Sequence, residues 1–371
     1  MTLPFFNTRL LDGERDILLK AVHQVATDPE QRFILGRRTV ELEKALREQF
    51  GAGDVVVCGS GSAALVLALR ALGVGPGDEV IVPAFGSEPL AGSVVAVGAR
   101  PVFADVDPQT MVLDVDDAEG LITDRTRVVV PAHTFTAMAD MPALVELAGR
   151  HGIAVLEDAA IAQGAALAGR HAGRWGEVGL FSFFPVKPLG MPGEGAALVT
   201  DDPEISRAVR MLRNHGQDGV HRFLHHTVGY NSRFDEVLAQ FQLNRLPVLP
   251  TLVEQRMRVV DRYTQAFAGL AHRGVRAPAA GHDGRCCYVY AIQVAERDRM
   301  RAHLARRGIG SHVHYPVPLP RLSAFADLAP TGRGWPGAEH ASARHLALPL
   351  WPGMTDAEVA RVVDAVCGFA G

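Results

Sequence analysis

The sequence predicts an α/β fold, in which helices cover both faces of a mostly parallel sheet and a smaller α+β domain follows at the C-terminal end. Two observations lead to this prediction. Short apolar segments alternate with amphipathic, helix-like segments between residues 38 and 200, which is the pattern of strands joined by helical crossovers. Apolar segments such as 128–131 and 153–156 also lack a polar face, as expected for strands that are covered on both sides.

The first 200 residues supply most of the predicted large domain. Helices are expected where apolar residues recur every three or four positions, and strands where short apolar runs lie between turn residues. The expected helices are residues 13–30, 38–50, 63–72, 88–98, a helix opened by the acidic stretch 114–119, and 140–151. The expected strands are residues 54–58, 79–83, 100–105, 127–132, 153–157, 178–184 and 195–200. Functional residues should gather beyond the carboxyl ends of the parallel strands.

The order of elements changes after about residue 247, and we place a domain boundary there. Residues 1–246 form the predicted large domain, with an N-terminal helical arm, and residues 247–371 form the predicted small domain. The elements expected in the small domain are a long helix at 248–271, a strand at 286–294, and helices at 297–307 and 355–369.

Charge, cysteine content and hydropathy argue against several functional classes. The net charge of −4 comes from mixed signs, so neither nucleic acid nor an anionic membrane is expected as a partner. The four cysteines form no CxxC pair, and no histidine pair has a convincing zinc spacing with a third ligand, so no metal is expected. No apolar run approaches 18 residues, and the N-terminus does not resemble a signal peptide. We therefore expect a cytoplasmic protein.

A single lysine, Lys187, lies between two prolines in a stretch that is otherwise apolar and rich in glycine. A lysine held among apolar neighbours would lose solvation, and its pKa would fall. Its amine would then be available as a nucleophile toward a carbonyl. The alternative is a solvated lysine on a loop between two strands, and this segment alone does not decide between the two.

Three further features would converge on the ends of the strands. The turn Gly59-Ser-Gly-Ser62 enters a helix, and free N–H groups at a helix N-terminus bind phosphate, although such turns are also common helix caps. Asp158 ends an apolar strand, either as a solvated strand end or as an anion that holds a proton on a heterocyclic nitrogen. Ser182 precedes Lys187 in an apolar strand, and its hydroxyl needs a partner if it is buried.

Taken together, these features describe a site for pyridoxal 5'-phosphate. That cofactor needs an amine for its Schiff base, an anion beside its pyridine nitrogen and hydrogen-bond donors for its phosphate. Each feature alone is a modest signal. Their combination, in this order along the chain, makes the prediction much stronger.

The chain also resembles the DegT/StrS-type sugar aminotransferases, which are fold type I pyridoxal-phosphate enzymes that add amino groups to keto sugars and cyclitols. The resemblance rests on phrases that occur in the family's order over nearly the whole chain. They are Gly61-Ser-Ala-Ala-Leu65, Gly75-Pro-Gly-Asp-Glu-Val-Ile-Val-Pro83, Pro101-Val-Phe-Ala-Asp-Val-Asp107, Glu157-Asp-Ala-Ala160, Phe181-Ser-Phe183 before Lys187, Gly193-Glu-Gly195, Gly229-Tyr-Asn-Ser-Arg233 and His314-Tyr-Pro316.

The resemblance implies a role for each matching residue. Lys187 would form the Schiff base with the cofactor and then carry the proton as general base and acid. Asp158 would pair with the pyridinium nitrogen. The backbone N–H groups of Ser62 and Ala63, with the Ser182 hydroxyl, would hold the phosphate.

The resemblance also implies a homodimer with shared active sites. In this family an asparagine at the position of Asn231 reaches the phosphate from the neighbouring subunit. The alternative is a turn residue, because Tyr-Asn-Ser is favourable turn chemistry. The surrounding phrase, Gly-Tyr-Asn-Ser-Arg, favours the functional interpretation.

Several positions near the cofactor depart from the family pattern. Ser87 stands where the family has an aromatic residue stacked on the cofactor ring, and Ile161 stands where it has a glutamine near the cofactor's 3-hydroxyl. Glu88 adds a carboxylate that the usual phrase does not supply. His314 and His133 are candidates for the substrate side of the site.

The predicted reaction is reversible transfer of an amino group from Glu or Gln to a keto sugar, often nucleotide-linked, or to a cyclitol. The resemblance places it in a specialised pathway such as antibiotic biosynthesis. The departures leave an alternative open, in which a repurposed enzyme of the same fold catalyses elimination, dehydration or epimerisation. A third interpretation is a non-catalytic partner protein, against which the retention of Lys187, Asp158, Ser182 and Asn231 argues.

Overall fold

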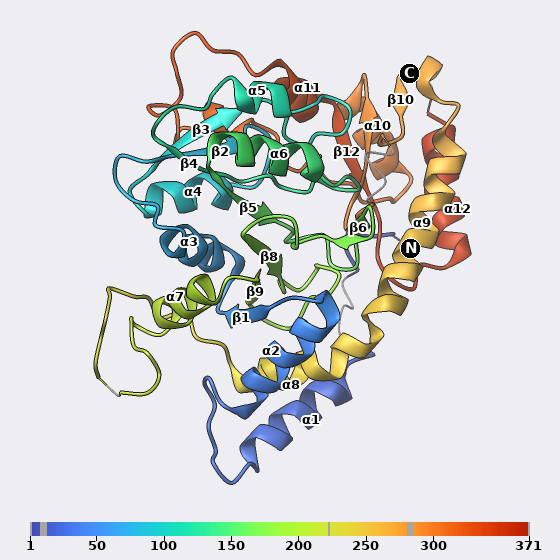
Figure 1. The fold of residues 1–371 in the computed structure, drawn as a ribbon. Helices are drawn as coiled ribbons and strands as arrows, with labels where there is room; N and C mark the ends of the chain where they lie inside the picture. Colours follow the sequence, from blue (N-terminus) through green and yellow to red (C-terminus); the bar gives the residue numbers. More distant parts are fainter. Residues whose placement is uncertain (1, 8–12, 222, 280–284, 370–371) are drawn as a thin grey trace.

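The computed structural model describes residues 2–7, 13–221, 223–279 and 285–369. A seven-stranded sheet with helices on both faces forms its centre (Figure 1), so the predicted α/β fold is confirmed. Across the sheet the strands are β1 (Asp54–Cys58), β9 (Ala196–Thr200), β8 (Val178–Ser182), β5 (Ala154–Asp158), β4 (Thr126–Val129), β2 (Glu79–Pro83) and β3 (Arg100–Ala104). From β8 to β3 all neighbours are parallel, whereas β9 is antiparallel to both β8 and β1.

Successive residues of each strand point to opposite faces of the sheet, and they build two separate cores. Val56 and Val82 face one core, whereas Val57 and Ile81 face the other. The first core is closed by α3 (Gly61–Ala71), α4 (Pro89–Ala96) and α7 (Pro203–Arg213). The second is closed by α1 (Arg15–Ala26), α2 (Arg37–Phe50), α6 (Met141–His151) and α8 (Glu236–Arg245). Strands that supply both cores have no polar face, which explains the continuous apolar runs in the sequence.

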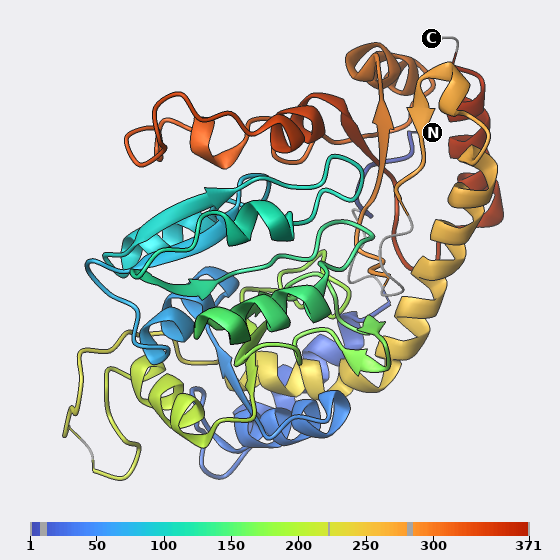
Figure 2. The same ribbon diagram turned by 45° about the horizontal axis from the view of Figure 1, so that its top comes forward.

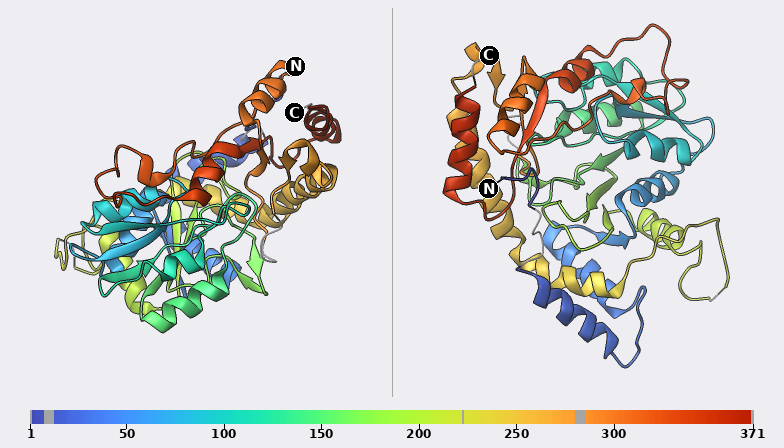
Figure 3. Two further views of the ribbon diagram at one scale, coloured as in Figure 1. Left: turned by 90° about the horizontal axis from the view of Figure 1, so that it is seen from above. Right: turned by 180° about the vertical axis from the view of Figure 1, so that it is seen from behind.

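The C-terminal part of the chain forms a second, smaller layer with its own apolar core. Its antiparallel strands are β10 (Val275–Arg276), β11 (Tyr290–Val294) and β12 (His345–Leu348). Its helices are α9 (Leu249–Phe267), α10 (Arg297–Arg306) and α12 (Asp356–Cys367). Helices α9 and α12 lie side by side along the outside of this layer (Figure 3).

Several contacts join this layer to the large domain, and helix α9 and Trp335 make two of them. Helix α9 begins beside the large domain, where Leu249 packs into the second core, and ends with Phe267 in the small core (Figure 1). Ahead of α11 (Pro336–Arg344), Trp335 donates its indole N–H to the carbonyl oxygen of Phe103 at 2.9 Å. This segment therefore lies over the β3 side of the sheet (Figure 2). The boundary at residue 246 stays a prediction.

Helices α7, α8 and α11 and strand β12 have no counterpart among the elements expected from the sequence. The strand expected at 286–294 begins only at Tyr290. Just before it, the N–H of Cys286 donates to the carbonyl oxygen of Thr136 at 3.1 Å. The residues ahead of β11 are thus attached to the large domain and do not extend the small sheet. Within the described parts of the chain, no helix is long and apolar enough to cross a membrane.

Candidate active site

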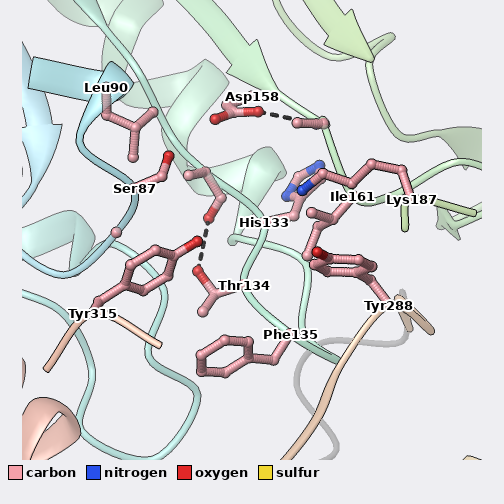
Figure 4. Close-up of a pocket in the computed structure, with 13 residues that line it drawn as sticks. Ser87, Leu90, His133, Thr134, Phe135, Asp158, Ile161, Lys187, Tyr288 and Tyr315 are labelled. Atoms are coloured by element: carbon pink, nitrogen blue, oxygen red, sulfur yellow. Dashed lines mark hydrogen bonds between the residues drawn. The ribbon is translucent and has the colours of Figure 1, made fainter. Parts of the chain in front are cut away.

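A cavity lies beyond the carboxyl ends of β2, β4, β5 and β8, where the sequence analysis expected the functional residues. Turns that follow parallel strands meet at one edge of the sheet, so residues far apart in sequence are brought together there. The lining residues, most of them labelled in Figure 4, are Gly86, Ser87, Leu90, Ala132, His133, Thr134, Phe135, Asp158, Ala160, Ile161, Lys187, Tyr288 and Tyr315. Five of them were predicted site residues: Ser87, His133, Asp158, Ile161 and Lys187.

Lys187 lies in the loop that follows β8, and its side chain points into the cavity (Figure 4). Its backbone N–H donates to the carbonyl oxygen of Phe184, and its own carbonyl oxygen accepts from the N–H of Gly190, both at 2.9 Å. Burial lowers the pKa of Lys187 to about 8, although the carboxylate of Asp158 opposes the shift. Near neutral pH a fraction of this amine is therefore uncharged and nucleophilic. Lys187 is half-buried and lines the cavity, so its position favours the lysine among apolar neighbours over the fully solvated one.

Asp158 is the last residue of β5, and its side chain is 8% exposed. Its backbone N–H donates to the carbonyl oxygen of Pro131 at 2.9 Å, so the residue is held against the neighbouring strand end. Its Oδ1 accepts from the N–H of Ala160 at 2.9 Å. Burial raises the pKa of Asp158, whereas the Ala160 hydrogen bond and Lys187 act in the opposite direction. A buried carboxylate of this kind is stabilised by a cation placed beside it.

The first turn of α3 faces Ser182 at the end of β8. A Cβ atom added to Gly61 would lie 3.6 Å from Ser182 Oγ. The N–H of Ala63 already donates to the Ser60 hydroxyl at 3.2 Å, whereas the N–H groups of Gly61 and Ser62 have no acceptor among the described residues. Two free N–H groups and a hydroxyl at a helix N-terminus fit a phosphate group. In this geometry the N–H of Ser62 is free for that purpose, and that of Ala63 is used by the helix cap.

These residues fit pyridoxal 5'-phosphate as a set. The cavity has one amine of lowered pKa and one buried carboxylate in its wall. The free N–H groups of Gly61 and Ser62, in the first turn of α3, face Ser182 at the end of β8. When bound, this cofactor provides a ring that accepts the electron pair left behind as a substrate carbon loses its proton. Among the described residues no group of three or more potential metal ligands is present.

His133 lines the cavity with a ring whose two nitrogens already have protein partners. Its Nε2 lies 2.8 Å from Glu157 Oε1, and the side chains of both residues are fully buried. Its Nδ1 accepts from the N–H of Ala139 at 3.2 Å. Glu157 also accepts from two backbone N–H groups, those of Gly173 and Trp175. The ring of His133 therefore forms part of the wall, and a substrate contact through its nitrogens would require one of these bonds to break.

The structure does not bring His314 and Glu88 to the cavity wall in the described parts of the chain. The ring of His314 lies behind that of Phe135, with 5.6 Å between the two centroids. Its Nδ1 is buried without a hydrogen-bond partner among the described residues, and burial lowers the pKa of His314 to about 3. The Glu88 carboxylate folds back against Gly92 of its own helix. Both stay candidates for contacts with a substrate.

Asn231 lies on the surface, near the end of a projecting loop between α7 and α8 (Figure 1). Its Oδ1 accepts from Arg233 Nε at 3.0 Å, and its backbone pairs with Asn214 at the base of the loop. The next residue, Ser232, accepts a hydrogen bond from the N–H of Gly59 at 3.1 Å. Asn231 is thus exposed. The residue beside it, Ser232, is bonded to the turn that leads into α3, whose free N–H groups fit a phosphate.

Ser87 and Ile161 both line the cavity, together with Leu90 (Figure 4). The side chain of Ser87 is too small to stack on a cofactor ring. An aromatic ring there would add roughly 0.5–1.5 kcal/mol beyond simple burial. We therefore expect Ser87→Tyr to hold pyridoxamine phosphate about 2- to 10-fold more tightly.

Ultrafiltration, with fluorescence of the released cofactor, measures this binding. Ser87→Ala is the matched control and should leave the affinity unchanged. If the tyrosine variant released the cofactor as readily as the natural protein, the position of Ser87 would not be the stacking position.

Two lining residues that were not predicted as site residues are Tyr288 and Tyr315. The Lys187 Nζ lies 4.2 Å from the centroid of the Tyr288 ring. Tyr315 belongs to the His-Tyr-Pro phrase and adopts a φ of 52°; burial raises its pKa. Both come from the C-terminal part of the chain, so only the packing of the two domains places them here.

Comparison with known families identifies the class of protein. Residues 15–367 match the DegT/DnrJ/EryC1/StrS aminotransferase family. A UDP-N-acetyl-3-dehydro-alpha-D-glucosamine 3-aminotransferase of Acidithiobacillus ferrooxidans is 39% identical over 95% of this chain and 93% of its own length. A dTDP-3-amino-3,4,6-trideoxy-alpha-D-glucose transaminase of Streptomyces venezuelae is also 39% identical, over 91% of this chain and 89% of its own.

Solved structures agree with this result. The structure of S. venezuelae DesV in complex with a ketimine intermediate has a TM-score of 0.93 and 38% identity, covering 98% of this chain and 97% of that chain. NtdA of Bacillus subtilis, solved with the bound cofactor PMP, has a TM-score of 0.91 and 28% identity, covering 99% of this chain and 84% of that one.

The fold, the cavity with its lysine and carboxylate, and these similarities define a fold type I aminotransferase. The chain belongs to the DegT/DnrJ/EryC1/StrS aminotransferase family.

Proposed function

We propose that this aminotransferase moves an amino group from glutamate or glutamine to a keto sugar that is linked to a nucleotide. Its cofactor is pyridoxal 5'-phosphate. The observation on which the proposal rests is the pairing of Lys187 with Asp158 in one cavity, next to free N–H groups that fit a phosphate. The relatives named above act on UDP- and dTDP-linked sugars according to their names. Nucleotide-linked acceptors are therefore preferred over cyclitols.

Each residue of the site has a separate task in this proposal. Lys187 binds the cofactor through its amine and then moves the proton at the reacting carbon, for which a pKa near 8 is well matched. Asp158 would pair with the cofactor's ring nitrogen, and its negative charge would favour the protonated form of that nitrogen. The N–H of Ser62 and the hydroxyl of Ser182 bind the phosphate.

Absorbance tests the central claim. The purified protein should show a visible band that disappears on borohydride reduction, with the reduced adduct on Lys187. Addition of L-glutamate or L-glutamine should then shift the band to that of the pyridoxamine form. A protein that stays colourless after cofactor addition would refute the proposed site. A panel of UDP- and dTDP-linked keto sugars, with free cyclitol ketones as comparison, identifies the acceptor.

A second candidate function follows from Ser87 and Ile161, which replace two side chains expected around the ring. In that case the same site would catalyse elimination, dehydration or epimerisation without net amino transfer. A visible band that persists with every amino donor would favour this candidate.

We further propose a homodimer in which Asn231 completes the partner's active site. The projecting loop that precedes Asn231 carries highly exposed apolar residues, including Val220, Phe223 and Val228, which are 74–82% exposed. Exposed apolar groups of this kind mark protein interfaces. A closed pair would place the loop of each subunit against the other.

A mixing experiment distinguishes a shared site from a self-contained one. We expect Lys187→Ala and Asn231→Ala to be inactive or weak alone. Mixed dimers would regain about a quarter of the natural activity, because half of the dimers are mixed and one of their two sites is intact. Sedimentation of the mixture measures dimer content, and Asn214→Ala replaces Asn231→Ala in the control. If Asn231 served its own subunit, mixing would restore nothing.

A further inference from the structure

The amine of Lys187 lies over the face of an aromatic ring. Its Nζ is 4.2 Å from the centroid of Tyr288, and both side chains line the cavity (Figure 4). A lysine ammonium within about 6 Å of a ring centroid is attracted by the ring's electrons, most strongly where water is excluded. The ring therefore favours the charged form of an amine that its burial otherwise disfavours.

A buried arginine holds the two residues in this arrangement. Arg256 of α9 is 4% exposed. Its guanidinium donates to the carbonyl oxygen of Tyr288 at 3.3 Å and to that of Val186, the residue before Lys187, at 3.4 Å. It also donates to the carbonyl oxygens of Cys287 and Leu350, both at 3.4 Å. One side chain thus contacts both the lysine loop and the tyrosine segment.

The other groups around Lys187 offer little stabilisation to its charge once the cofactor is bound. Asp158 attracts the ammonium in the free protein, but it faces the cofactor's ring nitrogen in the proposed function. His133 is bonded to Glu157, and His314 is a neutral imidazole at neutral pH. Tyr315 keeps its proton. The aromatic face of Tyr288 is therefore the group that is left to stabilise the ammonium of Lys187.

We propose that Tyr288 is a positioning residue whose ring receives the Lys187 ammonium whenever this lysine is not bonded to the cofactor. It stabilises the protonated amine and keeps it at the wall of the cavity, from where it returns the proton to the reacting carbon. This inference rests on the proposed role of Lys187. This role requires only the aromatic ring of Tyr288, and the hydroxyl group does not contribute to it.

The inference is tested on the full chain freed of cofactor, because that form has the free lysine. Trinitrobenzenesulfonate reacts only with neutral amines, and peptide mass spectrometry gives its rate at Lys187 as a function of pH. The rate at each pH is divided by the plateau rate at high pH, which removes differences in access to the lysine. For Tyr288→Leu we expect this normalised rate at pH 7 to rise roughly 3- to 10-fold, because the charged form has lost its aromatic partner. Tyr288→Phe, the matched control, should stay within about twofold of the natural protein.

Two outcomes would overturn the inference. One is a normalised rate in Tyr288→Leu that is unchanged or lower; the other is a Tyr288→Phe protein that behaves like Tyr288→Leu, since the hydroxyl would then matter. If Tyr288→Leu does not fold, as judged by circular dichroism, Tyr288→Met serves as the second non-aromatic variant. The labelling needs neither cofactor nor turnover. Its result is therefore independent of the absorbance tests on which the proposed function depends.

Discussion

Replacement of Lys187 by alanine should abolish amino transfer and the visible absorbance band. The variant loses the only described amine in the cavity wall, and with it both the covalent link and the group that moves the proton. Proton transfer by a positioned side chain contributes a factor of roughly 10²–10⁴ by itself. We therefore expect the rate of each half-reaction to fall by at least about 10²-fold, and by about 10⁴-fold if the proton transfer contributes its full range. Rapid-scan absorbance with L-glutamate and with pyridoxamine phosphate plus keto sugar measures the two half-reactions.

A second variant and a rescue experiment distinguish the loss of the chemical group from damage to the structure. Lys187→Arg keeps a positive charge but lacks a nucleophilic amine, so it should be as inactive as the alanine variant. A small primary amine such as methylamine should enter the space left in Lys187→Ala and restore part of the proton transfer. Full activity in the arginine variant would mean that the lysine contributes only its charge.

Replacement of Asp158 by asparagine should leave the cofactor bound while the rate of proton removal falls. Asparagine has the same shape, and its side-chain oxygen can still accept from the N–H of Ala160. What it removes is the negative charge beside the ring nitrogen. A single preorganised electrostatic group in an active site is worth roughly 10²–10³ in rate, and we expect a loss of that size in kcat with a visible band still present.

The matched control for this change is Asp202→Asn. Asp202 caps the N-terminus of α7 through its carboxylate oxygen, and the amide oxygen of asparagine caps a helix equally well. It lies on the surface, so activity should not change. An Asp158→Asn enzyme with the natural rate would show that Asp158 does not hold the ring nitrogen in its protonated form.

The chain by itself determined the fold class and the central pair of the site. Continuous apolar runs require helices on both faces, so residues such as Ile81 and Val82 already implied two cores. Parallel strands end at one edge of the sheet, and this rule alone predicts that Asp158 and Lys187 lie near each other. The turn after β1 likewise indicated a helix N-terminus that fits an anion. These features are local patterns, and local patterns can be identified from a sequence.

Only the tertiary structure decided which polar groups are free. His133 had looked available, but its partner Glu157 lies 24 positions away and occupies one of its ring nitrogens. The N–H of Ala63, which the resemblance assigns to the phosphate, donates to the Ser60 hydroxyl in the structure. Tyr288 lies on a segment that reads as a strand of the small domain. It meets Lys187 because its segment is attached to the large domain by backbone hydrogen bonds. Contacts between domains depend on how two whole surfaces pack together, and the periodic pattern of apolar residues along the chain does not predict that packing.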